Sequence, residues 1–373
     1  MQTYIFTPER LAQHWHKMAT FSFNFDIGPD SSAANADGAV IPVSEHSTSS
    51  SVSECRKGTC TVCDEAPTDP PQTGQCGLLD VTEVDVAALC RPSGEEIDSA
   101  ATSYSRELVQ LSDGVGVVCL TKALPEPSER LMKEGSLLGP WREPSGVERA
   151  QEANSDLIAG VYEGGMKIWE CAIDLATFLL TNQTLRCQGK RVIELGCGVG
   201  LPGVCAVLQA AQLVAFQDYN AEVLTSRTIP TAFYNGTLRN GQFQNVEEFS
   251  KVCQFCYGDW GVLVQKMSQN NFQWKHGFDV ILASETIYCR ENYHKFLSAV
   301  KYFLKPSGVV YLAAKSYYFG VGGSVAEFRE FVITDGYFDV NEVASFGQDT
   351  VHRTILMLSV RHSVCEYVGD SAP

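Results

Sequence analysis

The sequence predicts an α/β fold in which a mostly parallel, seven-stranded sheet with one antiparallel strand carries helices on both faces. From Asp156 onwards, apolar segments of strand length alternate with segments of helical periodicity. This alternation is typical of parallel strands joined by helices that cover the sheet. The chain then closes with two strand patterns in succession, at 337–346 and 353–361. Two consecutive strands form a hairpin, and a hairpin reverses one strand of the sheet.

The individual elements follow from the apolar patterns in chain order. A helix is expected from Ile168 to Leu179, where apolar side chains repeat with helical spacing. Before the closing hairpin we expect five strands, at 191–195, 213–218, 251–258, 278–285 and 309–316. The helices between them are expected at 202–212, 221–230, 292–304 and 325–336. The third of these ends at a Lys-Pro-Ser-Gly stretch, which is a helix stop signal.

The chain is expected to divide into three parts. Residues 1–76 are expected to be disordered, because residues 28–60 are rich in Ser, Ala, Gly and acids and hold no aromatic residue. The stretch before Met18 is interpreted as an extension upstream of a natural start. Residues 77–155 are expected to form an irregular extension that packs on the main domain, and residues 156–373 to form that domain.

Charge and composition bear on the partners and the compartment. The net charge is −16, and −12 of it lies in residues 1–155, where 23 acidic residues face 11 basic ones. This balance argues against direct nucleic-acid binding and suits a basic protein partner, or a soluble spacer. No stretch approaches the roughly 18 apolar residues that span a bilayer, and we expect a monomer. Fourteen cysteines without a secretion signal predict a reducing compartment, here the cytoplasm and nucleus.

Two cysteine patterns were weighed as metal sites. Cys55, Cys60, Cys63 and Cys76 include the spacing of zinc ligands, but their surroundings lack the strands and turns of a zinc ribbon. The pair in Cys253-Gln-Phe-Cys256 falls in an apolar strand pattern and has no second pair. We therefore expect no metal, and buried thiols in that strand.

The glycine-rich turn after the first predicted strand fits two cofactor motifs. Residues 198–203 match G-x-G-x-x-G, which binds dinucleotides. Residues 194–200 match E-x-G-x-G-x-G, the usual opening of S-adenosylmethionine (AdoMet) enzymes. An acid beside a pyrophosphate is unfavourable, whereas an acid beside the ammonium and sulfonium of AdoMet is favourable. We therefore predict AdoMet contacts from Glu194, Gly196, Cys197, Gly198 and Gly200, with a turn-capping role as the alternative for Glu194.

The ends of the later strands supply further cofactor candidates. Asp218 is placed to accept hydrogen bonds from ribose hydroxyls, in either class of cofactor. Asp259 and Trp260 are placed to contact the adenine, and their alternative roles are a helix N-cap and a core tryptophan. Ser284 opens a loop expected to face the methyl donor, and this loop lacks the N-P-P-Y motif of amide and adenine methylation. Five strand units followed by a hairpin are the architecture of class I methyltransferases.

Two longer motifs are more specific than the glycine turn. They are Gly-Val-Tyr-Glu-Gly-Gly-Met-Lys-Ile-Trp-Glu at 160–170 and Lys-Ser-Tyr-Tyr-Phe-Gly-Val-Gly-Gly at 315–323. Together with Phe-Gln-Asp-Tyr-Asn at 216–220 and Ala-Ser-Glu-Thr-Ile-Tyr at 283–288, they make residues 156–373 resemble the histidine protein methyltransferase family. Before this region, only Phe-Ser-Phe-Asn-Phe at 21–25 resembles the family.

The resemblance implies AdoMet-dependent methylation of a histidine imidazole in a large-subunit ribosomal protein. Glu170, Glu285 and Tyr288 are then candidates to accept a hydrogen bond from the ring, with bracing of the loop after the fourth predicted strand as the alternative role of Glu285 and Tyr288. Trp169, Tyr162 and Tyr317 are candidate walls of the pocket that face the sulfonium through cation–π contact, although core packing explains Trp169 nearly as well. Tyr317, Phe319 and Gly320 belong to an aromatic and glycine-rich segment where a peptide substrate would lie.

The sequence leaves three other functions open. The first is an AdoMet-dependent methyltransferase acting on lysine or on a small molecule. The second is an AdoMet-binding factor without turnover, and the third is a hydride-transfer enzyme that uses the dinucleotide motif.

Overall fold

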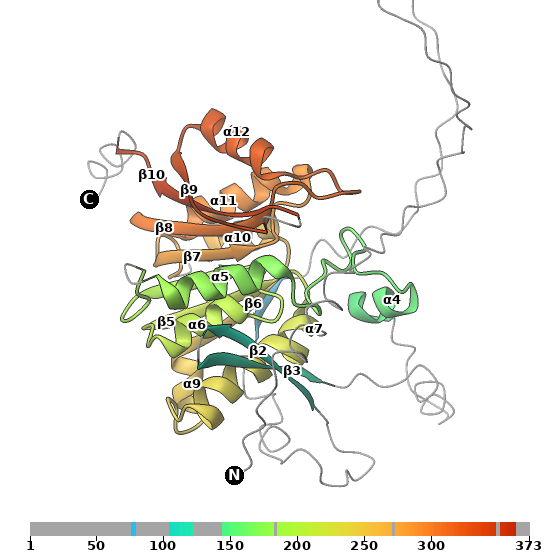
Figure 1. Cartoon of the computed structure of the whole chain (residues 1–373), viewed down its shortest axis with the longest axis vertical. Helices are drawn as coiled ribbons and strands as arrows, with labels where there is room; N and C mark the ends of the chain where they lie inside the picture. Colours follow the sequence, from blue (N-terminus) through green and yellow to red (C-terminus); the bar gives the residue numbers. More distant parts are fainter. Residues whose placement is uncertain are drawn as a thin grey trace, which may run out of the picture.

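The computed structural model of the chain describes residues 76–79, 104–112, 114–122, 144–182, 185–270, 273–347 and 351–362. The expected disorder of residues 1–75, the extension before Met18 and three of the four cysteines weighed as zinc ligands lie outside the described residues. Figure 1 shows a central sheet with helices on both sides and a separate hairpin beside α5 (Glu170–Thr181) and α6 (Leu201–Leu208).

The sheet has eight strands in the order β1-β6-β5-β4-β7-β8-β10-β9. Neighbours from β6 to β8 are parallel, and β10 is antiparallel to both β8 and β9. The fold class predicted from the sequence is therefore confirmed. The strands are β1 (Gly77–Leu79), β4 (Arg191–Leu195), β5 (Leu213–Asp218), β6 (Cys253–Tyr257), β7 (Phe278–Ser284), β8 (Leu304–Lys315), β9 (Phe338–Phe346) and β10 (Arg353–Val360).

The predicted strand count of seven was wrong by one strand, β1. This three-residue strand pairs antiparallel with β6 at the edge of the sheet, with Gly77 opposite Tyr257. A Gly-Leu-Leu stretch is too short to show the alternation of a strand in the sequence, so only the tertiary pairing reveals it. The sequence pattern also missed two helices, α9 (Val246–Val252) and α10 (Trp260–Gln269).

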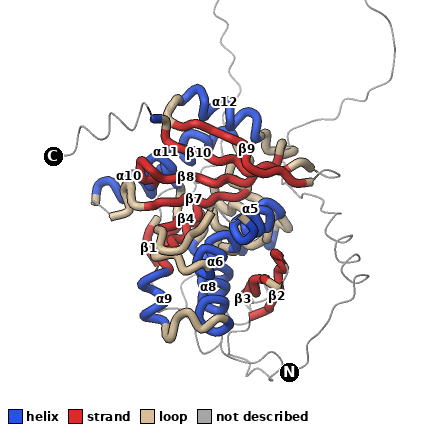
Figure 2. The backbone as a smooth tube through the Cα atoms, turned by 60° about the vertical axis from the view of Figure 1, so that its left-hand side comes forward, coloured by secondary structure: helices blue, strands red, loops and turns tan. Residues whose placement is uncertain are grey.

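The helices bury the two faces of the sheet in two separate apolar clusters. One cluster joins α5, α6, α8 (Ile229–Phe233) and α9 to one face through side chains such as Leu175, Val204 and Phe249. The other joins α10, α11 (Tyr293–Phe303) and α12 (Val325–Asp335) to the opposite face through Leu263, Phe296 and Phe328. Figure 2 shows these two sets of helices on either side of the strands. Cys253 and Cys256 are buried thiols of β6, as expected.

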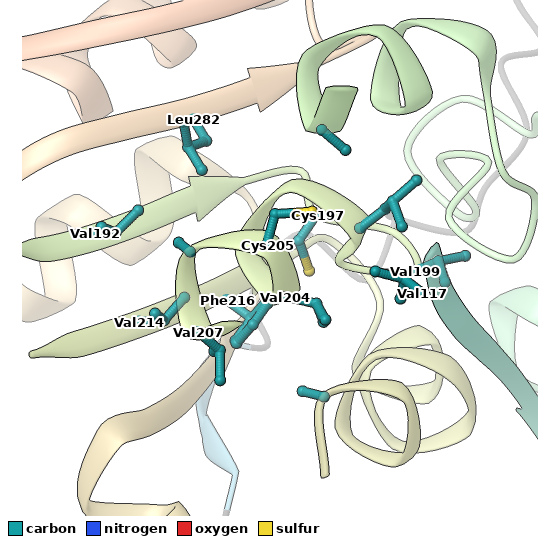
Figure 3. Packing of buried hydrophobic residues seen from close by; sticks show 14 of the residues in the cluster. Val117, Val192, Cys197, Val199, Val204, Cys205, Val207, Val214, Phe216 and Leu282 are labelled. Atoms are coloured by element: carbon teal, nitrogen blue, oxygen red, sulfur yellow. The ribbon is translucent and has the colours of Figure 1, made fainter. Parts of the chain in front are cut away.

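The packing around α6 explains how the first strand and its turn are held. Figure 3 shows Val204 and Val207 of α6 against Val192 of β4 and against Val214 and Phe216 of β5. All five side chains have no exposed surface. Burial of a side chain of this size stabilises a fold by about 1.5–3 kcal/mol. The glycine turn between β4 and α6 is therefore anchored on both sides.

The helix predicted over 221–230 continues to Arg239 as α7 (Ala221–Val223), η2 (Leu224–Thr228), α8 and η3 (Tyr234–Arg239). The segments η2 and η3 are π-helical, and the amide of Ile229 donates to the carbonyl of Leu224, five residues earlier. The sequence interpretation stopped at Pro230 because proline lacks an N–H. The wider π turns accommodate Pro230, and its fully buried neighbours Ile229 and Thr231 hold the helix in place.

A two-stranded hairpin, β2 (Tyr104–Ser112) and β3 (Val115–Lys122), packs against the helices that follow β5. The amide of Leu120 donates to Thr231 Oγ1 at 2.9 Å, and the amide of Val118 donates to Asn235 Oδ1 at 3.0 Å. Further along the chain, α4 (Gly146–Glu152) packs through Val147 and Ala150 on Tyr162 and Val223. Among the described residues, no helix is long and apolar enough to cross a membrane.

Candidate functional site

A cavity of about 500 Å³ lies at the carboxyl ends of the central parallel strands. Its walls come from the loop before α5, the glycine turn, the ends of β5 and β6, the loop after β7 and the segment after β8. The volume is that of a site for a small-molecule ligand, and ligands of open α/β sheets bind at this edge.

The glycine turn forms one wall with a backbone that few other residues could adopt. Gly196, Gly198 and Gly200 have φ angles of 62°, 51° and 80°, in the left-handed region that favours glycine. A Cβ at Gly200 would lie 2.7 Å from Thr228 Cγ2, and one at Gly198 would lie 3.2 Å from the carbonyl oxygen of Gly165. The glycines are therefore required by the turn itself and by the close approach of the loop that contains Gly165.

Asp218 ends β5 and turns both carboxylate oxygens towards backbone amides. Oδ2 accepts from Gly198 N at 2.8 Å, and Oδ1 accepts from Asn220 N at 3.1 Å. Burial raises the pKa of this carboxyl to about 6, against the opposing effect of these amides. Asp218 lines the cavity and connects the glycine turn to the start of α7.

Gln217, which the sequence interpretation missed, organises the neighbouring wall. Its Oε1 accepts from Gly196 N at 3.1 Å and from Trp260 Nε1 at 2.7 Å. Its Nε2 donates to the carbonyl of Gly258 at 2.9 Å. A polar residue beside Asp218 at the end of an otherwise apolar strand was the signal available in the sequence. Gln217 fixes the distance between the turns that follow β4 and β6.

Asp259 and Trp260 combine both of the roles weighed for them. Asp259 is the N-cap of α10, accepting from Gly261 N at 2.9 Å, and its Oδ2 lies 2.8 Å from Lys295 Nζ. The Trp260 ring packs edge-on against Phe296 with centroids 5.2 Å apart. Both residues also line the cavity. A capping or core role does not remove them from the site.

On the opposite wall, a loop preceding α5 is fixed to the ends of β5 and β7. Glu163 accepts a hydrogen bond from the Tyr288 hydroxyl, and its Oε1 accepts from Gly160 N at 2.7 Å. Tyr219 donates to the carbonyl of Gly160 at 2.7 Å, and Asn220 Nδ2 donates to that of Val161 at 2.8 Å. Burial, followed by the charge of Glu163, raises the pKa of Tyr288 well above its usual range. Tyr288 is therefore a neutral donor at physiological pH.

The cavity lies within a region that matches known methyltransferases. Residues 157–319 match a family model described as lysine methyltransferase. A relative from Dictyostelium discoideum, named histidine protein methyltransferase 1 homolog, is 37% identical over 51% of this chain and 59% of its own length. The homolog of the same name from Mus musculus is 35% identical over 58% of this chain and 62% of its own length. This region of the chain is therefore similar in sequence to histidine protein methyltransferases.

The chain spans about three fifths of the length of these curated relatives. A more distant relative, EEF1A lysine methyltransferase 3 of Mus musculus, is 24% identical over 40% of this chain and 55% of its own length. The solved magnesium protoporphyrin IX methyltransferase of Synechocystis with bound SAM is 13% identical, with a TM-score of 0.37 over 63% of this chain and 92% of that chain. That likeness adds nothing to the strand order described above.

The residues of the cavity fit AdoMet as a methyl donor. Most of the predicted cofactor contacts line the cavity, namely Trp169, Gly196, Cys197, Gly198, Gly200, Asp218, Asp259, Trp260 and Ser284. The left-handed glycines leave space that side chains would fill, and Asp218 presents a carboxylate beside them. Among the described residues, no group of three or more His, Cys, Asp or Glu could hold a metal ion.

Glu194 does not line the cavity, contrary to our prediction that it faces the cationic cofactor. Its side chain is fully buried on β4, and Oε2 accepts from Gly203 N in the first turn of α6 at 2.7 Å. Burial raises the pKa of Glu194 well above its usual range, although the Gly203 amide opposes this. The backbone amides in the first turn of a helix have no acceptor within the helix, and the Glu194 carboxyl accepts from one of these amides in α6.

Of the three predicted acceptors, Glu285 and Tyr288 line the cavity, whereas Glu170 does not. Glu170 instead contacts Lys315, a cavity residue, with Oε2 2.8 Å from Lys315 Nζ. Sequence reasoning missed Lys315, although it opens the motif at 315–323 that carries part of the family resemblance. A lysine that ends a buried strand was the available signal.

The predicted peptide-binding residues lie outside the cavity. Tyr317 and Phe319 are 43% and 63% exposed, and their rings meet edge-on with centroids 5.0 Å apart. Tyr318 between them is buried and lines the cavity, which the sequence interpretation missed. Tyr162 is a buried residue of the loop before α5. Its hydroxyl accepts from Met166 N in the same loop at 2.9 Å, so Tyr162 does not form the pocket wall. Gly320 follows the exposed pair and has a φ of 84°.

Proposed function

We propose that this protein is an AdoMet-dependent protein-histidine N-methyltransferase. The observation that carries the proposal is the 35–37% identity to histidine protein methyltransferase 1 homologs across the region that forms the cavity. The cavity adds a second line of support, because Glu285, Tyr288 and Tyr318 bring polar groups to the wall opposite the glycine turn.

The bound cofactor would supply an electrophilic methyl group, and the residues of the chain would position the acceptor. A histidine side chain has a pKa near 6.5, so it is mostly neutral and nucleophilic at about pH 7. The protein therefore needs little general-base chemistry and has mainly to orient the ring and exclude water. Glu285 is the group that we assign to hold the ring N–H, and Trp169 forms an aromatic wall. Tyr288, held by Glu163, braces the loop that carries Glu285.

The substrate proposed is a basic protein of the large ribosomal subunit. The net charge of −16 supports a basic partner, and Tyr317, Phe319 and Gly320 offer an exposed surface beside Tyr318, which lines the cavity. We propose that the protein acts as a monomer in the cytoplasm and nucleus. Binding the target through exposed aromatic side chains would leave the cavity free to accept a single imidazole.

Lysine methylation is the competing function, favoured by the description of the matching family model. An assay that incubates the full chain with labelled AdoMet and total protein of the large ribosomal subunit distinguishes the two functions. Acid hydrolysis of the labelled protein releases methylhistidine in one case and methyllysine in the other. We expect labelled methylhistidine alone. Labelled methyllysine would replace our proposal with the competing one.

The same experiment tests the remaining alternative, a protein that binds AdoMet without transferring the methyl group. In that case calorimetry would show AdoMet binding while no amino acid of the ribosomal proteins became labelled. A control reaction with Asp218→Ala, which removes a carboxylate from the cavity, should lose any label that depends on this site.

A further inference from the structure

Three charged side chains meet at one end of the cavity, where α5 approaches the ends of β7 and β8. Glu170 is the first residue of α5, Glu285 follows β7, and Lys315 ends β8. Since β7 and β8 are parallel neighbours, with Ser284 opposite Ala313, Glu285 and Lys315 reach the same edge of the sheet. Lys315 Nζ lies 2.8 Å from Glu170 Oε2 and 3.4 Å from Glu285 Oε1.

The two ion pairs of Lys315 differ in their exposure to solvent. The side chains of Lys315 and Glu285 are 4% and 8% exposed, whereas that of Glu170 is 44% exposed. Water screens the pair with Glu170, so that pair contributes little. The pair with Glu285 lies in a low-dielectric environment, where removing one charge leaves the other buried without a counter-ion. Lys315 is therefore chiefly the counter-ion of Glu285.

Glu285 has one carboxylate oxygen engaged and one without a partner. Oε1 accepts from Cys171 N at 3.5 Å, at the N-terminus of α5, and faces Lys315. Oε2 is buried and accepts no hydrogen bond of normal length from the residues that the structure describes, although the Glu285 carboxylate lies near the Tyr318 hydroxyl and the Cys171 thiol. Leaving a buried acceptor unpaired is costly, and Glu285 lines the cavity. The backbone of Glu285 is also left-handed, with φ of 56°, which is rare for a residue with a side chain.

We propose that Lys315 is a positioning residue that keeps Glu285 ionised, so that Oε2 accepts the N–H of the target imidazole. This inference rests on the proposed function. With one ring nitrogen held as a donor, the lone pair of the other nitrogen faces the methyl donor. The ring becomes cationic as the N–CH3 bond forms and the S–CH3 bond of the methyl donor breaks, with that electron pair left on sulfur. The ionised Glu285 stabilises the ring charge until the proton on the first nitrogen passes to water. The chain would therefore produce one of the two methylhistidine isomers.

Five other titratable groups lie around this cluster. They are Glu170, Cys171 and Asp174 on α5, Tyr318 after β8 and Arg353 on β10. Burial, reinforced by the charge of Glu285, raises the pKa of Cys171 and of Tyr318 well above their usual ranges, so both stay neutral. Burial alone would raise the pKa of Glu170, but the hydrogen bond and charge of Lys315 outweigh it and lower that pKa.

Asp174 and Arg353 form their own ion pair. Asp174 Oδ2 lies 2.5 Å from Arg353 Nε. Burial raises the pKa of Asp174 despite this pair, but the pair is common to every variant considered. For Lys315 itself, burial lowers the pKa, and the charges of Glu285 and Glu170 outweigh it, so the ammonium remains protonated. Removing Lys315 therefore leaves the buried carboxylate of Glu285 without its counter-ion.

The first test measures stability against pH and needs no activity. Lys315→Met, Glu285→Gln and the double variant are unfolded with urea at pH 5, 6, 7 and 8. We expect Lys315→Met to be less stable than the wild-type protein, with a deficit that grows as the pH rises. In this variant the buried carboxylate of Glu285 has no counter-ion, so the folded state favours its protonated form. The free energy of unfolding therefore falls as the pH rises and the carboxyl must ionise.

The double variant should lose this pH dependence, because both buried charges are gone. Lys301→Met is the matched control, since Lys301 of α11 pairs with Asp335 at the end of α12, 2.6 Å away, and should show no such trend. Equal pH profiles of Lys315→Met and the double variant would overturn the proposal. This outcome is independent of whether the wild-type protein methylates histidine.

The second test follows the product, with total protein of the large ribosomal subunit and labelled AdoMet as probes. We expect the wild-type protein and Lys301→Met to form a single methylhistidine isomer. Glu285→Gln and Lys315→Met should lower kcat/KM at least tenfold, form detectable amounts of the second isomer and bind AdoMet within twofold of the wild-type affinity. An unchanged isomer ratio in Glu285→Gln would overturn the assignment, whereas absence of methylhistidine with the wild-type protein would contradict the proposed function instead.

Discussion

At the scale of single residues, the end of β5 holds much of the polar chemistry of the cavity. Asp218 accepts hydrogen bonds from the backbone amides of Gly198 and Asn220. Gln217 beside it accepts from the amide of Gly196 and from the indole N–H of Trp260. These two side chains join the turns after β4, β5 and β6. A ligand that contacts Asp218 therefore contacts a group that also fixes the shape of the glycine turn.

Asp218 should make AdoMet binding depend on pH. Burial raises the pKa of its carboxyl to about 6, so the carboxylate is protonated as the pH falls below that value. Ribose hydroxyls donate best to the ionised form, and we expect the affinity to fall up to about tenfold per pH unit below pH 6. Calorimetric titration of the full chain with AdoMet at pH 5, 5.5, 6, 7 and 8 measures this.

Asp218→Ala should weaken AdoMet binding by roughly ten- to a hundredfold at pH 7.5, since hydrogen bonds to a charged group contribute about 1.5–3 kcal/mol. It should also remove the pH dependence. Asp279→Ala is the matched control, because Asp279 lies near the start of β7, at the opposite edge of the sheet, and pairs with Lys305. Affinity that is equal in Asp218→Ala and wild type would refute the assignment of the cavity.

Individual site residues were predictable where a motif fixes both residue type and position. The glycines, Asp218, Asp259 and Trp260 follow strand ends, and strand ends of a parallel sheet converge. Gln217, Lys315 and Tyr318 were missed because their roles depend on contacts with residues distant in the sequence. The role of Lys315, for example, depends on its ion pairs with Glu170 and Glu285, which are 145 and 30 positions away in the sequence.

At the scale of elements, the junction between β4 and α6 shows how a motif residue can serve the fold instead of the ligand. Glu194 begins the E-x-G-x-G-x-G motif, yet its carboxyl binds Gly203 N on the α6 side of the turn. The sequence pattern placed this acid correctly at the end of β4 but could not show on which face of the strand its side chain lies relative to the cavity.

Glu194→Gln should therefore leave AdoMet affinity within twofold of wild type and raise stability at high pH. Burial raises the pKa of Glu194, so the folded state favours the protonated carboxyl. The contribution of this group to the free energy of unfolding is lost as the pH rises above the pKa of Glu194 in the unfolded chain. A glutamine keeps the acceptor for Gly203 N without that loss. Urea unfolding at pH 5 and pH 8 should show a gain over wild type only at pH 8, and a large fall in AdoMet affinity would restore a direct role for Glu194.

At the scale of the whole molecule, the alternation of strands and helices was sufficient to predict the sheet and its reversed strand. Features outside that pattern were not predictable. The edge strand β1 depends on pairing with β6, and the β2–β3 hairpin depends on packing against α5 and α8. Both come from the part of the chain before Asp156, where residues 107–124 indicate a strand or two but the sequence does not show how they pair and pack.

The cavity draws its walls from both halves of the sheet, so occupying it should stabilise the whole molecule. A ligand that binds only the folded state adds about 2.7 kcal/mol at a concentration of 100 times its Kd. For a domain of about this size, each kcal/mol raises Tm by roughly 2–4 °C. Saturating AdoMet should therefore raise Tm by about 5–11 °C, whereas NAD should have no effect, because the proposed function uses AdoMet as its cofactor. A rise in Tm with NAD and none with AdoMet, measured by scanning calorimetry, would return the glycine turn to its dinucleotide interpretation and contradict the methyltransferase proposal.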